Sequence, residues 1–217
     1  MREKYLSFMF FLLVAAGCRD SADKSVTVVP GVSYSNGTAG QQVVNLPDGS
    51  HVTIGSGTVI VASKGFGKEG RDVEIDGEGM FEVAGSREPG ASAAPGTSAA
   101  PENMGSKPFV VHTGNLIIEV LDTNGPGRSG ANGSGAGGWG SRFAVDAVRK
   151  RAGEEVDLLG GRLRVTKSYH SDTDSLPEEL TAGDMVMINR EIDLMEKEKK
   201  SGPEEDKVKE KFHLASH

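Results

Sequence analysis

This chain of 217 residues has one cysteine, no long apolar run and no excess of positive charge. The single cysteine, Cys18, excludes an internal disulfide framework and a zinc site built from several thiolates. The longest apolar run, residues 6–16, is too short to cross a bilayer, and no later run reaches the roughly 18 residues of a membrane-spanning helix. A formal net charge of -7 argues against a nucleic-acid partner and against docking on anionic lipid. The mature chain is therefore predicted to be a folded domain that does not itself span a membrane.

Residues 1–17 have the pattern of an export signal that is removed after translocation. Arg2 and Lys4 supply positive charge, an apolar core follows, and small residues then lead into Cys18. This order resembles the lipobox of bacterial lipoproteins, although those usually carry Leu where Ala15 stands. We interpret Cys18 as a lipidation site that anchors the domain in the cell envelope, facing the periplasm, with either membrane as its location. The alternative is a stray cysteine after an ordinary signal.

Short alternating runs of apolar and polar residues fill positions 41–188. The runs that indicate strands are residues 43–46, 51–54, 58–61, 73–75, 80–83, 109–112, 116–120, 143–145, 155–159, 163–165 and 185–188. Many short strands with glycine turns predict an all-β domain, a roll, barrel or β-helical solenoid. Turns are expected at Pro47-Asp48-Gly49 and at Asp76-Gly77. Before this domain, the small polar residues of 18–40 indicate a flexible tether, to which Val28 and Val29 could add a strand.

Two low-complexity insertions interrupt the strands, at about residues 86–106 and 124–141. The first is rich in Ala, Pro, Gly and Ser, and the second is nearly half glycine, so both are expected to form loops. Trp139 stands in the second insertion, where its side chain either docks the loop on the domain or contacts a partner. At the other end of the domain, residues 189–217 are strongly charged and favour a helical tail in two pieces, with Pro203 in the first turn of the second.

The reactive side chains form no pattern typical of catalysis or metal binding. His51, His112 and His170 each stand far from every other histidine, so none of these three makes the closely spaced pair that a metal site uses. Asp48, Asp76, Glu78 and Glu82 could approach one another across strands, but carboxylates beside glycines most often cap their own turns. No serine or cysteine stands in a nucleophile motif. We predict a binding or structural domain with no enzymatic activity, cofactor or metal; a hydrolase would need these carboxylates gathered in one cleft.

A set of short motifs stands in a fixed order along residues 41–188. They are Leu46-Pro47-Asp48-Gly49-Ser50, Gly55-Ser56-Gly57-Thr58, Phe66, Arg71-Asp72-Val73, Gly77-Glu78 with Phe81 and Val83, Pro108-Phe109-Val110, Gly161-Arg162-Leu163 and Leu180-Thr181-Ala182-Gly183. In this order they resemble the FecR family, the extracytoplasmic sensors of bacterial iron-uptake signalling. The resemblance implies a β-helical or roll-like fold and carries over no catalytic or ligand site. The residues that it implies as its scaffold are Asp48, Gly49, Ser50, Gly77, Glu78, Phe81 and Phe109.

The chain also departs from the family pattern. Asp122 stands where the family has glycine, and Phe143-Ala144-Val145 follows late, behind the second insertion. Typical members carry a cytoplasmic segment that holds a sigma factor, a transmembrane helix, and a C-terminal domain that contacts a TonB-dependent receptor, and none of these is evident here. Because the export signal begins at Met1, we expect a sensor-like domain without direct anti-sigma activity.

Two functions remain as predictions. The first is a lipid-anchored, extracytoplasmic FecR-like domain that binds an envelope protein, such as a TonB-dependent receptor or a membrane anti-sigma component, in trans-envelope signalling. The second is a structural or polysaccharide-binding β module of the envelope with no transcriptional role. The first predicts a specific protein partner, whereas the second predicts retention on cell wall or polysaccharide.

Overall fold

The computed structural model describes residues 26–84, 107–121, 139–173, 176–200 and 202–212. The predicted signal peptide, Cys18, the first insertion and most of the second lie outside the described residues. The prediction of an all-β fold is confirmed, because strands dominate the described part and its one helix is short. None of the described residues forms a helix that is long and apolar enough to cross a membrane.

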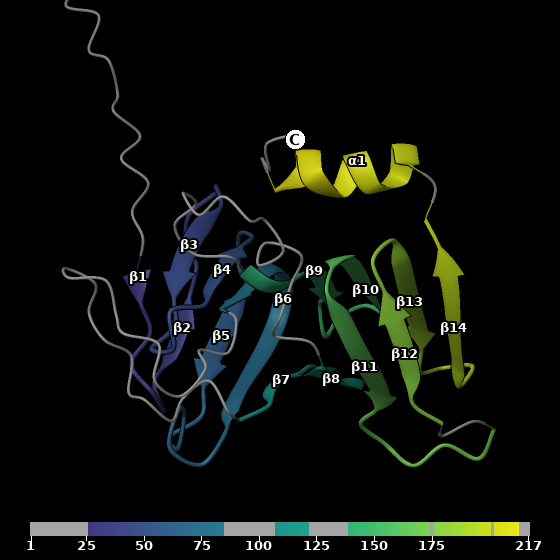
Figure 1. Ribbon diagram of the computed structural model, residues 1–217, viewed down its shortest axis with the longest axis horizontal. Coiled ribbons are helices and arrows are strands. Elements are labelled where there is room, and N and C mark those ends of the chain that lie inside the picture. Colours follow the sequence, from purple (N-terminus) through teal and green to yellow (C-terminus); the bar gives the residue numbers. More distant parts are fainter. Residues whose placement is uncertain (1–25, 85–106, 122–138, 174–175, 201, 213–217) are drawn as a thin grey trace, which may run out of the picture.

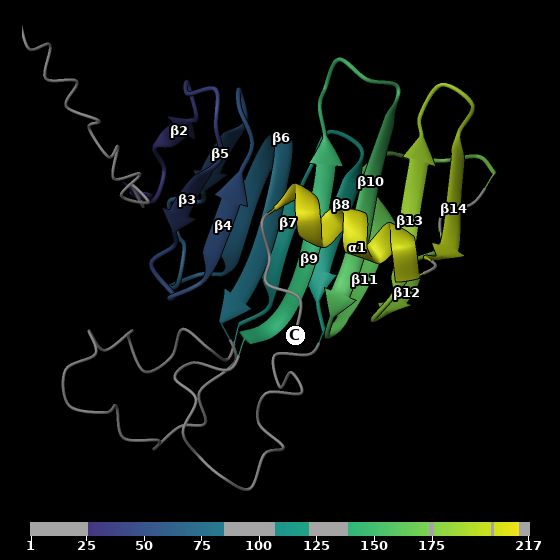
Figure 2. The same ribbon diagram turned by 90° about the horizontal axis from the view of Figure 1, so that it is seen from above.

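The strands form two facing layers, which share β6 and so make one continuous, nearly closed sheet (Figures 1 and 2). Sheet A runs in the order β1 (Val26–Thr27), β3 (Gln42–Asn45), β4 (His51–Ile54), β6 (Arg71–Ala84), β9 (Trp139–Ala147), β10 (Gly153–Gly160), β13 (Asp184–Asn189) and β14 (Leu194–Lys199). Sheet B runs in the order β2 (Ser33–Ser35), β5 (Val59–Ala62), β6, β7 (Phe109–His112), β8 (Leu116–Val120), β11 (Arg162–Lys167) and β12 (Glu178–Thr181).

The long strand β6 turns the corner between the two layers. Its first half pairs with β5 and β7 in sheet B, and its second half pairs with β4 and β9 in sheet A. The predicted turn at Asp76-Gly77 is therefore wrong, since the chain continues there as a strand. Gly77 has φ of 129°, and a Cβ at this position would lie 2.8 Å from the Cα of Thr58. Glycine serves the corner because no side chain fits between the two strands there.

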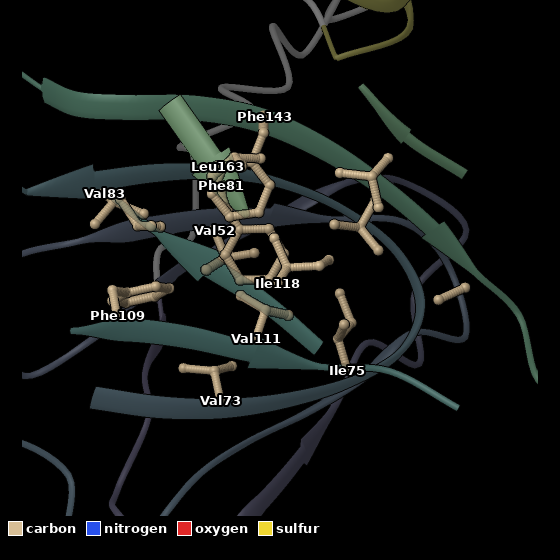
Figure 3. Packing of buried hydrophobic residues seen from close by; sticks show 14 of the residues in the cluster. Val52, Val73, Ile75, Phe81, Val83, Phe109, Val111, Ile118, Phe143 and Leu163 are labelled. Carbon is tan, nitrogen blue, oxygen red and sulfur yellow. The ribbon is translucent and has the colours of Figure 1, made fainter. Parts of the chain in front are cut away.

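The hydrophobic core fills the space between the layers, where the inward residues of both sheets meet (Figure 3). Phe81 stacks on Phe143 with ring centroids 5.0 Å apart, and Phe109 lies edge-on to Phe81 at 6.4 Å. All three rings are fully buried, which on an area basis gives each roughly 2–3 kcal/mol of stabilisation. Strands from distant parts of the sequence are thus joined by one aromatic cluster.

The prediction of a flexible tether over 18–40 is wrong from residue 26 onward. β1 pairs with β3, β2 pairs with β5, and Val28 is buried in the core. The buried Asn36 closes this segment on the domain, because its side-chain amide donates to the carbonyl oxygens of Gly40 and Gly55 at 2.8 and 3.0 Å. Strands of two and three residues are too short to give an alternating pattern, so composition alone suggested a linker.

The charged C-terminal segment contains a strand as well as a helix. The prediction of a helix directly after residue 189 is wrong, because residues 194–199 form β14, which pairs antiparallel with β13. A ladder to β13 and the ion pair of Lys197 with Asp184, at 3.3 Å, outweigh the helix propensity of Lys and Glu. The second piece is helical, as α1 (Gly202–Lys211), with Pro203 in its first turn. α1 crosses the outer face of sheet A above β9 and β10 (Figure 2).

Candidate functional site

The motif residues 46–50 form a turn that is tied to the interior. Asp48 accepts hydrogen bonds from the backbone N–H and the hydroxyl of Ser50, both at 2.9 Å, while Gly49 adopts φ of 86°. The Ser50 hydroxyl in turn accepts from the backbone N–H of Ala84 at the end of β6, at 3.0 Å. Asp48 and Ser50 are buried, so their polar atoms are used within the fold.

Arg71 is a buried cation at the start of β6, and it links this turn to β7. Its Nη1 lies 3.2 Å from Oδ2 of Asp48, and its Nε donates to the carbonyl oxygen of Lys107 at 2.9 Å. The guanidinium also lies over the ring of Phe109, 5.5 Å from its centroid. Burial lowers the pKa of Arg71, and the charge of Asp48 opposes this shift. Asp48, Ser50, Arg71 and Phe109 therefore form one interior network, and we assign it to the scaffold.

The structure does not gather the candidate acid/base carboxylates into one cleft, since each is held by a different cation. Asp48 pairs with Arg71 in the interior, Asp76 lies 3.5 Å from Arg149, and Glu78 lies 3.0 Å from Lys211. The described residues also contain no group of three or more His, Cys, Asp or Glu side chains placed to hold a metal ion. Glu78 points outward, unlike the buried motif residues Asp48 and Ser50, and it belongs to the face described next.

Trp139 occupies the first position of β9, where it pairs with Ala84. The predicted second insertion therefore ends before Trp139 and not at residue 141. The Trp139 side chain and Cys18 both lie outside the description, so the predicted partner contact and lipidation site stay predictions.

The outer face of sheet A carries a row of four carboxylates and one methionine that crosses five strands. Glu78, Asp146 and Glu155 stand directly opposite one another on β6, β9 and β10, and Met187 on β13 and Glu196 on β14 continue the row. We call these five residues the acidic row. Like charges opposite each other on neighbouring strands are destabilising, so the row requires cations. They are Arg151, 2.7 Å from Asp146, and Lys200, 2.8 Å from Glu155.

A second row lies beside the acidic row on the same face and consists of Met80, Ala144, Asp157, Met185 and Glu198. The helix α1 packs on the end of this row that is formed by Met80 and Ala144. Met80 and Ala144 are buried under Val208 and Phe212 of the helix and the residue after it, with Leu159 beside them. Lys211 adds ion pairs to Glu78 at 3.0 Å and Asp146 at 4.0 Å. A groove of about 410 Å³ runs along the junction of the helix with β9, β10 and β13.

Asp157 lies in this groove, in the same row as Ala144 and Met185. Burial, opposed by Lys200 and assisted by the neighbouring charge of Glu155, raises the pKa of Asp157 to about 6. Oδ1 of Asp157 lies 2.5 Å from Nζ of Lys200 and forms an ion pair with it. The carboxyl group beneath α1 thus titrates closer to neutral pH than an exposed aspartate does.

A second groove, of about 380 Å³, continues the first across β10, β13 and β14, away from α1. The two grooves share Asp146, Glu155 and Met187. Three apolar side chains line the second groove while exposed to solvent. They are Met187, Ile192 and Leu194, with exposed fractions of 40%, 66% and 47%.

The β13–β14 turn, which carries Ile192, is fixed by its neighbour Asp193. Asp193 has φ of 51° and accepts hydrogen bonds from Thr173, Lys167 and Ser171 at 2.8 to 3.0 Å. These bonds, that from Thr173 first, lower the pKa of Asp193. Lys167 and Ser171 lie 2.8 Å apart, but Lys167 forms an ion pair with Asp193, and an ammonium group cannot accept the Ser171 proton. We therefore assign this cluster to the structure of the turn.

Known proteins resemble this chain in fold. Two solved structures, at 1.65 and 2.50 Å resolution, of "a putative anti-sigma factor from Parabacteroides distasonis ATCC 8503" superpose on it with a TM-score of 0.53 and 21% sequence identity. The match covers 78% of this chain and 60% of theirs, so this chain spans less than two thirds of the length of those proteins. No family model and no curated protein matches the sequence. The comparison shows a shared fold.

Proposed function

We propose that this chain is a FecR-like domain of the cell envelope that is anchored by lipid at Cys18 and acts in regulation by binding an envelope protein. The observation that carries this proposal is the joint occurrence of the ordered motifs and a fold shared with the anti-sigma factor structures described above. On this proposal the domain has no catalytic activity.

The positions of the motif residues support a binding role at other surfaces. Asp48, Ser50, Arg71 and Phe109 direct their polar atoms and rings into the fold, so they are not available to a partner. Recognition would then fall to outward-facing side chains, which can vary without loss of the fold. The outer face of sheet A is the region where such side chains line two continuous grooves.

In-cell crosslinking of the tagged full chain, followed by membrane capture and mass spectrometry, tests the proposal. A Cys18→Ser form is the control for anchoring, and labelling with a fatty-acid analogue checks that only the parent chain carries lipid. The proposal predicts recovery of a TonB-dependent receptor or a membrane anti-sigma component, and only from the anchored form. Recovery of wall polymer or abundant porins alone would favour a structural or polysaccharide-binding module instead.

A further inference from the structure

We infer that the second groove, lined by Met187, Ile192 and Leu194 beside Glu196, binds a basic amphipathic segment of the protein partner. This inference rests on the proposed function, since it requires a protein partner, and it adds the surface and the chemistry of the bound segment. Such a segment would place apolar side chains on the three exposed apolar residues and Lys or Arg side chains on the carboxylates.

The first reason is that α1 already occupies the neighbouring part of this face with the same chemistry. Val208 and Phe212 supply its apolar contacts, Lys207 and Lys211 line the groove, and Lys211 pairs with Glu78 at 3.0 Å. The acidic row and its apolar neighbours thus accept a short segment with Lys and apolar side chains on one side. The second groove continues this surface beyond the reach of the helix.

The second reason is charge complementarity at the open end. Arg151 and Lys200 pair with Asp146 and Glu155, whereas Glu196 and Glu198 form no ion pair within the described part of the chain. Both side chains lie in the rows of the outer face, opposite Met187 and Met185. A positively charged partner group would therefore meet uncompensated carboxylates directly beside exposed apolar surface.

The third reason is that the apolar side chains are held in place before binding. Asp193 locks the turn that presents Ile192, through hydrogen bonds from β11 and the segment that follows it. A preorganised surface loses little conformational entropy on binding. Strand addition along the free edge of β14 fits less well, because alternating Lys and Glu on an edge strand oppose such pairing.

Site-specific photo-crosslinking in cells, with the full anchored chain, tests this surface. A photoreactive phenylalanine analogue is placed at position 192 in one form and at position 32 in the control. Val32 is a matched site, since it is also an exposed aliphatic residue, 54% exposed, but it precedes β2 at the far edge of sheet B. The inference predicts that a protein is captured from position 192 and that the crosslinked peptide contains alternating or helically spaced Lys/Arg and apolar residues.

Variants of the groove then test whether this contact contributes to binding. Ile192→Asp combined with Leu194→Asp should reduce capture by about tenfold or more, as expected when apolar anchors at a contact are lost. Glu196→Lys should reduce it severalfold, and Val32→Asp should leave it unchanged. Circular dichroism of each purified variant verifies that the β fold is retained.

The outcomes separate this inference from the proposed function. Capture of an envelope protein from position 32 and not from position 192 would contradict the second groove as the binding surface, but it would still support the proposal that the domain binds an envelope protein. Capture at position 192 of an acidic segment, of lipid or of polysaccharide would overturn the chemistry assigned here. Capture of no protein from either position, together with none in the general crosslinking experiment, would overturn both.

Discussion

The interior around Arg71 and the outer face of sheet A both place acids beside bases, but they balance them differently. In the interior, Asp48 and Arg71 are matched one to one, and backbone groups and a phenylalanine ring satisfy most of the remaining contacts. On the outer face, several carboxylates share few cations, and Glu196 has no ion pair within the described part of the chain. The comparison suggests that the matched charges fix the fold, while the unmatched ones are available for recognition.

The largest expected effect comes from breaking the matched pair. Asp48→Ala leaves the Arg71 guanidinium buried without its counter-charge, and it also removes two hydrogen bonds from Ser50. We expect a loss of about 3–5 kcal/mol in the free energy of unfolding, measured by urea denaturation. The double variant Asp48→Ala/Arg71→Met should recover part of the loss. A loss below about 1 kcal/mol for the single variant would contradict the interior role.

A somewhat smaller effect is expected at the corner of β6. Gly77→Ala introduces a Cβ only 2.8 Å from the Cα of Thr58, at a backbone φ of 129° that side chains disfavour. We expect a cost on the order of 3 kcal/mol in the free energy of unfolding, which combines backbone strain and overpacking. Gly49→Ala is the matched control, because its φ of 86° is also positive but open space surrounds it. Equal costs at the two glycines would argue against a crowded corner.

A carboxyl group on the outer face of sheet A is expected to make the free energy of unfolding depend on pH. The pKa of Asp157 is raised to about 6, above its ordinary value of 3.8, so the folded state binds a proton more tightly than the unfolded chain does. The resulting stabilisation is full below about pH 4 and is lost as the pH rises through about 6. Asp157→Asn should flatten the unfolding free energy across this window by on the order of 2 kcal/mol. Glu196→Gln, on the same face, serves as the control, and parallel profiles for Asp157→Asn and the parent would refute the assignment.

The smallest effect is expected for an exposed ion pair. Arg162 and Glu179 lie 3.3 Å apart on β11 and β12, and about half of each side chain is exposed. Arg162→Ala should change the free energy of unfolding by at most about 1 kcal/mol, because water already solvates both charges. A change as large as that for Asp48→Ala would mean that burial is not what separates strong from weak pairs in this domain.

Every run that the sequence predicts as a strand overlaps a strand of the structure, and the bounds agree best where apolar and polar residues alternate over four or more residues. Residues 51–54 and 116–120 match β4 and β8, because one face of each strand enters the core. Two predictions were wrong for other reasons. β14 carries charged residues on both faces, so its sequence has no apolar face that would indicate a strand, and only its pairing with β13 shows it. The dipeptide Asp76-Gly77 is compatible both with a turn and with the corner of a continuous strand, so the sequence does not distinguish the two.

The candidate site was less predictable than the fold. The acidic row is built from residues on five strands between positions 78 and 196, and a row of this kind depends on the register of the strands, which no local pattern shows. Glu78 was identified through its motif, but its neighbours Asp146 and Glu155 carried no signal. One feature of the sequence does indicate the second groove. Ile192 and Leu194 interrupt an otherwise charged segment, and apolar residues that are exposed on a folded surface indicate an interaction site.

The most direct test of the distinction between interior and outer face measures two variants side by side for stability and for partner capture. Asp48→Ala/Arg71→Met alters the interior, and Ile192→Asp/Glu196→Lys alters the second groove. We predict that the first variant unfolds at lower urea but captures the partner normally while folded, whereas the second keeps its stability and loses capture. The reverse pattern, with capture lost from the folded interior variant and retained by the groove variant, would contradict the assignment of scaffold and recognition surface.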